Sequence, residues 1–67
     1  MPKKIRELIS DLKSAGFKLD RQTGSHRQFL HPALGGTLTL SGNEGDDARR
    51  YQEKQVSEAI AISKKSN

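Results

Sequence analysis

Residues 17–31 read FKLDRQTGSHRQFLH, two stretches joined by a glycine turn. In 17–21 apolar and polar side chains alternate, as expected for a half-buried β-strand, and 26–31 are expected to form a second strand directly after the turn. Gly24, in the turn between them, tolerates a positive φ, and Pro32 ends the second strand because it has no backbone N–H to donate. The stretch therefore predicts a β-hairpin with half of its side chains on each face of a sheet.

The segments on either side of the hairpin add two helices and a strand. Apolar residues recur at helical spacing and predict a helix over 3–15 that stops at Gly16. Residues 37–40 alternate strictly and predict a third strand. A second helix is expected after it, capped by Asp46 or Asp47. The apolar positions of that helix are Val56, Ala59 and Ile60, with Tyr51 and Ser63 at the margins.

The order helix–strand–strand–strand–helix predicts a single α+β domain over residues 1–67, in which both helices cover one face of a three-stranded antiparallel sheet. The other face stays open to solvent, as alternation permits. If Phe29 points to the core, Arg27 shares its side and His26 faces the open side, whereas Leu30 favours the opposite parity. We favour an outward His26, because a ring that can carry charge is less costly there.

Composition limits the classes of function. The 67 residues include no cysteine, which excludes disulfides and thiolate metal sites, and two histidines without a carboxylate cluster do not suggest zinc. We expect no metal and no cofactor. No apolar run approaches the roughly 20 residues of a membrane helix, and no signal-peptide core is evident, so we expect a soluble, cytoplasmic protein.

The net charge of +4 is unevenly distributed. Residues 1–31 carry seven Lys or Arg against three Asp or Glu, whereas 32–67 carry five of each. A basic half attracts polyanions, so the charge pattern favours a nucleic-acid partner.

His26 is the candidate functional residue. Histidine exchanges a proton near neutral pH, and the adjoining Arg27 supplies a guanidinium suited to phosphate oxygens. A metal-free phosphodiester-cleaving site needs such a pair, with the histidine as base or acid and the cation stabilising charge on the phosphoryl oxygens. Lys18 and Arg21 are the alternative cations. The residues expected to shape the turn are Gly24 and Ser25. A lone histidine is also commonly an ordinary surface residue, so the pattern by itself leaves the role open.

The other conspicuous side chains have structural interpretations. His31 before Pro32 is expected to pack at the strand end, and Tyr51 at the rim of the core. Arg49 and Arg50 are expected to form a solvated face.

Three short motifs occur in order along the chain: Ala15-Gly16-Phe17, Gly24-Ser25-His26 and His31-Pro32. With Phe29 between the last two, they resemble the HicA toxin family over nearly the whole chain. The resemblance implies a fold like that of double-stranded-RNA-binding domains, cleavage of mRNA and inhibition by a HicB antitoxin. The family's catalytic histidine corresponds to His26.

The chain also departs from the family pattern. Arg27 stands where many members have a second histidine, and residues 41–43 replace a proline and a histidine. Two other functions fit the same pattern. The first is a non-catalytic RNA-binding module, and only His26 distinguishes the ribonuclease from it. The second is a protein-interaction domain that docks through the open sheet face.

Overall fold

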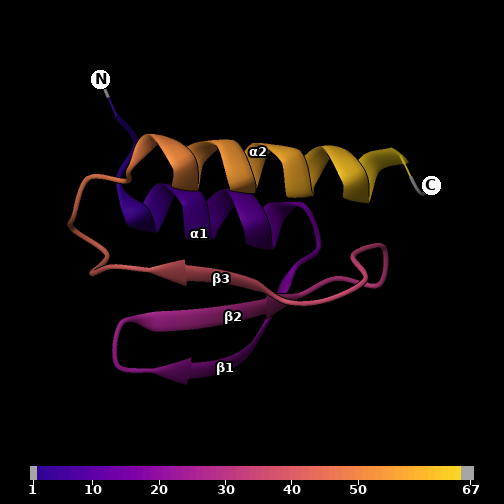
Figure 1. Cartoon of the computed structure of the whole chain (residues 1–67), viewed down its shortest axis with the longest axis horizontal. Coiled ribbons are helices and arrows are strands. Elements are labelled where there is room, and N and C mark those ends of the chain that lie inside the picture. Colours follow the sequence, from indigo (N-terminus) through magenta and orange to yellow (C-terminus); the bar gives the residue numbers. More distant parts are fainter. Residues whose placement is uncertain (1, 66–67) are drawn as a thin grey trace.

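The structure is a computed structural model that describes residues 2–65. Its elements in chain order are α1 (Ile5–Ser14), β1 (Lys18–Thr23), β2 (His26–Leu30), β3 (Leu38–Ser41) and α2 (Arg50–Lys65). The strands form an antiparallel sheet in the order β1-β2-β3, and both helices lie along one side of it (Figure 1). The predicted α+β fold is confirmed. Neither helix is long and apolar enough to cross a bilayer.

α1 ends in a left-handed turn at Gly16. This glycine has a φ of 94°, and its N–H donates to the carbonyl of Lys13 at 3.1 Å. The N–H of Phe17 reaches back to the carbonyl of Leu12 at 3.0 Å, which completes a Schellman motif. The sharp stop sends the chain directly into β1.

The hairpin of β1 and β2 contains a bulge. The turn at Gly24, whose φ is 59°, sets Thr23 opposite His26, and pairing continues to Arg21 opposite Gln28. Between Arg21 and Leu19 the register shifts, so Asp20 is the extra residue of a β-bulge. Directly opposed residues share a face of a sheet. The bulge therefore puts Arg21 on the open face, whereas simple alternation from Lys18 would have put it on the helix side.

The core fills the space between the helices and the covered face of the sheet. Phe29 lies at its centre and is fully buried. The other buried apolar side chains are Ile5, Leu8, Leu12, Phe17, Leu40, Ala48, Val56 and Ala59. Each large side chain of this kind stabilises the fold by about 1.5–3 kcal/mol. α1 and α2 run side by side in the same direction above this layer (Figure 1).

His31 belongs to the structure of the loop after β2. Its ring stacks at 4.7 Å from the ring of Phe17, and its Nδ1 accepts the N–H of Ala33 at 3.0 Å. The predicted packing role of His31 is confirmed.

α2 begins at Arg50, which is further along the chain than a cap at Asp46 or Asp47 would place it. Asp46 accepts a hydrogen bond within its own turn and Asp47 pairs with Lys4, so the prediction that one of them caps α2 is wrong. Instead, the side-chain Oε1 of Gln52 accepts the N–H of Arg49 at 2.8 Å, as in half of a capping box. The buried glutamine thus binds the N–H of the residue just before α2, which is a different amide from those that an N-cap aspartate accepts.

Candidate functional site

His26 is the first residue of β2 and is exposed on the open face of the sheet. The outward orientation favoured from the alternation is confirmed, and it follows from the position of Phe29 three residues later on the covered face. A positive φ at Gly24 reverses the chain just before the histidine. His26 consequently stands at the rim of the sheet, where a ligand as large as a nucleic acid can reach it.

Ser41 is the direct partner of His26. The two residues oppose each other across the β2–β3 ladder, and Ser41 Oγ lies 2.6 Å from His26 Nδ1. This bond orients the ring and leaves Nε2 without a partner among residues 2–65. If Nδ1 carries the proton and donates it to Ser41 Oγ, Nε2 is free to accept one; in the other tautomer Nε2 carries the proton.

Arg27 lies on the opposite face of β2 from His26 and is only 8% exposed. Its Nη1 donates to the carbonyls of Gly42 at 2.8 Å and Ser25 at 3.4 Å, and the N–H of Gly42 donates to the same Ser25 carbonyl at 3.2 Å. The guanidinium therefore ties together the loop before His26 and the loop after Ser41. The structure does not bring it beside the imidazole.

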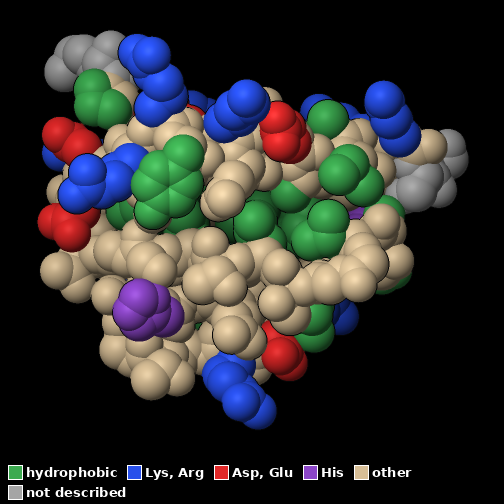
Figure 2. Space-filling view, in the orientation of Figure 1, with side chains coloured by type: hydrophobic (Ala, Val, Ile, Leu, Met, Phe, Trp, Pro, Cys, Tyr) green, Lys and Arg blue, Asp and Glu red, His purple; other side chains and the backbone are tan. Residues whose placement is uncertain are grey.

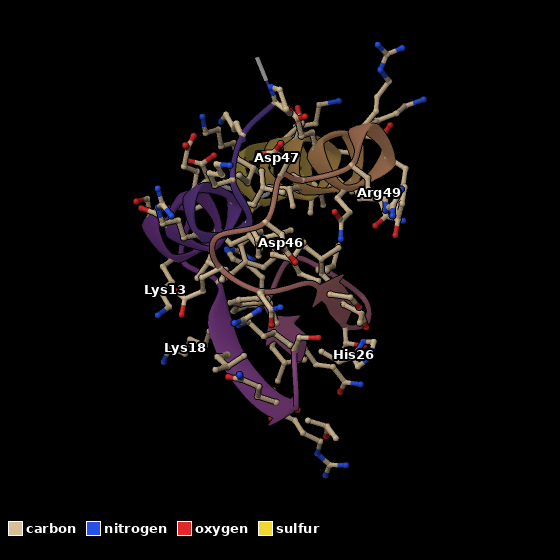
Figure 3. All side chains as sticks on the ribbon, turned by 90° about the vertical axis from the view of Figure 1, so that its left-hand side faces the viewer. Lys13, Lys18, His26, Asp46, Asp47 and Arg49 are labelled. Atoms are coloured by element: carbon tan, nitrogen blue, oxygen red, sulfur yellow. The ribbon has the colours of Figure 1, made fainter. Side chains whose placement is uncertain are left out.

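Arg21 and Lys18 lie at different positions along β1. Arg21 opposes Gln28, two residues from His26, whereas Lys18 opposes Leu30 at the far end of the strand. Figure 3 shows Lys18 and His26 pointing to opposite sides of the molecule. Of these two cations, Arg21 is thus the nearer to His26.

Gln52 supports the site from α2. This side chain is buried, and its Nε2 donates to the carbonyl of Ser41 at 2.7 Å while its Oε1 holds the N–H of Arg49. It fixes the end of β3 to the start of α2. Neither Gln52 nor Ser41 was a predicted site residue; the strand register would have indicated Ser41, since the residue opposite His26 shares its face.

The turn residues have backbone roles. Gly24 supplies the positive φ, with no atom within 4 Å of a side chain added there, and Ser25 contributes its carbonyl to the bonds with Arg27 and Gly42. Within residues 2–65, no three side chains of His, Asp or Glu gather in a way that would hold a metal ion.

Comparison with known proteins gives one family. Residues 5–62 match the family described as the HicA toxin of bacterial toxin–antitoxin systems. No curated protein and no solved structure gave a match. The matched range includes every element described above, from the start of α1 to the last turns of α2. The chain therefore belongs to the HicA toxin family, whose members are the toxins of bacterial toxin–antitoxin pairs.

Proposed function

We propose that this toxin is a metal-independent endoribonuclease, an mRNA interferase with His26 as its catalytic residue. The observation that carries the proposal is the exposed imidazole of His26, which Ser41 orients through Nδ1 while Nε2 has no partner within residues 2–65. The membership of the chain in a toxin family and its net charge of +4 support RNA as the target.

The reaction is transesterification within the RNA. His26 Nε2 takes the proton of a ribose 2′-hydroxyl, and the 2′-oxygen attacks the adjacent phosphorus. The bond from phosphorus to the 5′-oxygen of the next nucleotide breaks, and that oxygen takes a proton from solvent. The products are a 2′,3′-cyclic phosphate and a 5′-hydroxyl. Because the nucleophile belongs to the substrate, the protein has to supply a base, positioning and charge stabilisation.

The cations divide into two roles. Arg21 is the candidate contact for the phosphoryl oxygens near His26, since both side chains occupy the open face. Lys18, at the far end of β1, binds the RNA backbone further along. Arg27, with its guanidinium engaged by two carbonyls, holds the loops around the site.

The partner that restrains the enzyme is a HicB-type antitoxin. Membership in the family implies a toxin–antitoxin pair. An antitoxin that covers the open face would exclude RNA from His26, and both proteins would meet in the cytoplasm, where mRNA is translated.

The decisive experiment compares variants at the two histidines. His26→Ala should abolish cleavage of RNA and growth inhibition, with an unchanged circular dichroism spectrum and RNA affinity. His31→Ala should lose stability, because His31 packs on Phe17, but the folded fraction should still cleave RNA.

Two further tests address the chemistry. Excess EDTA should leave wild-type cleavage unchanged, and RNA with a 2′-deoxyribose at the cleaved position should resist cleavage. Cleavage by folded His26→Ala would show that another residue is the catalyst, whereas no cleavage by the wild-type protein would leave it as a non-catalytic RNA-binding module.

A further inference from the structure

A groove opens directly beside the His26–Ser41 pair. It has a volume of about 640 Å³ and runs between the end of β3 and the start of α2. Its walls include Ser41, Gly42, Arg49, Tyr51 and Gln52. Since Ser41 both lines the groove and bonds to His26, a chain seated at the histidine has the groove as its immediate continuation.

Tyr51 presents an aromatic ring at this groove. Its side chain is 57% exposed, more than Ile62 at 45%, Leu19 at 43% or Leu30 at 39%. The expectation that Tyr51 packs at the rim of the core is wrong, because the residue is mostly exposed and is not among those packed against the core. An exposed ring offers its face to a nucleobase, and such stacking contributes about 1–3 kcal/mol per base.

Arg49 adds an unpaired positive charge. Its guanidinium makes no hydrogen bond or ion pair within residues 2–65, and the backbone amides of Arg50 and Tyr51 at the positive end of α2 are also without partners there. Arg49 points to the same side of the molecule as His26 (Figure 3). Phosphate oxygens are the ligands that such a guanidinium and free amides prefer.

Two acidic side chains also line the groove, and each has a partner. Asp47 forms an ion pair with Lys4, and Asp46 accepts the N–H of Asn43. Figure 3 shows both carboxylates set back from the edge that carries His26 and Arg49. In Figure 2 the large purple histidine patch stands below a group of hydrophobic, basic and acidic side chains near the start of α2, with uncharged surface directly between them.

We infer that this groove binds the nucleotide next to the scissile phosphate of a single-stranded RNA. Tyr51 stacks on its base and Arg49 contacts its phosphate, while His26 faces the phosphate that is cleaved. The strand is single because bases in a duplex are covered on both faces by their neighbours and cannot reach the ring. This inference rests on the proposed function for its link to cleavage, but the binding step can be measured without it.

The test uses the His26→Ala protein and a short fluorescent RNA, so that binding is measured without cleavage. Tyr51→Ala should weaken binding of the single strand about tenfold, whereas Tyr51→Phe, which keeps the ring, should bind like the parent. The same variants should bind a duplex of that sequence equally well. A 2-aminopurine placed along the strand should be quenched at one position by Tyr51 and not in Tyr51→Ala.

The matched control for Arg49 is its neighbour Arg50. Arg50 lines a separate groove between α1 and α2 and carries the same charge one residue away. Arg49→Gln should reduce the slope of log affinity against log salt by about 1, and Arg50→Gln should change it less.

The outcomes separate this inference from the ribonuclease proposal. If wild-type protein cleaves no RNA but Tyr51→Ala still loses single-strand binding, the catalytic proposal fails and the groove assignment stands. The groove assignment is overturned if Tyr51→Ala binds as tightly as its parent, or loses affinity only for the antitoxin. It is likewise overturned if Arg49→Gln and Arg50→Gln behave alike.

Discussion

Ser41 and His26 face each other on adjacent strands, and the bond between them holds the imidazole in one orientation, which is the orientation that RNA would meet under the proposed function. Ser41→Ala should lower kcat about tenfold, equivalent to ~1.4 kcal/mol, with KM unchanged, because the ring loses its orientation while the binding surface stays the same. Ser41→Thr should restore the rate, since threonine keeps the hydroxyl and suits a strand.

Thr39 provides the control for this experiment. It lies two residues earlier on the same strand and face, opposite Gln28, and its hydroxyl does not reach His26. Thr39→Val should therefore leave kcat unchanged. An equal loss in Thr39→Val and Ser41→Ala would show that β3 contributes general polarity rather than a specific bond.

At the scale of elements, the bulge in β1 controls which cation reaches the open face. Deletion of Asp20 should give a regular ladder in which Arg21 still opposes Gln28. Deletion of Gln22 should also give a regular ladder, but it places Asp20 opposite Gln28 and turns Arg21 to the helix side. Both proteins should fold, and in the His26→Ala background only the second should lose RNA affinity, with a salt slope reduced by about 1.

Asp20→Asn completes the comparison, because deletion of Asp20 also removes a negative charge. The affinity of Asp20→Asn for RNA should match that of the protein that lacks Asp20. Equal RNA binding by the two deleted proteins would mean that Arg21 makes no phosphate contact.

The same elements show which features of the structure can be predicted from the sequence and which cannot. The apolar spacing of α1 and the alternation around Gly24 predicted the fold, because burial of one face imposes a period on the chain. The bulge at Asp20 and the pairing of His26 with Ser41 depend on register, which is set between strands and leaves no local pattern. Gln52 was missed because its bond to the carbonyl of Ser41 joins residues that lie 11 positions apart in the sequence.

At the scale of the whole molecule, the sheet presents its open face on the side opposite the helices (Figure 1). We expect a HicB-type antitoxin to cover His26 there, to compete with RNA, and to associate faster at low salt because the chain is basic. Diethyl pyrocarbonate labelling with mass spectrometry measures this: modification of exposed His26 should fall in the complex, with half-buried His31 as the reference. Equal labelling of His26 in free and bound protein would place inhibition elsewhere.

The clamp made by Arg27 has a consequence for how such a protein is governed. Its bonds to Ser25 and Gly42 hold both flanks of the histidine while no RNA is present, so the site is complete as soon as the chain has folded. Under the proposed function, such a ribonuclease would have no inactive form that a signal must convert. The amount of antitoxin relative to toxin would then decide whether RNA is cleaved.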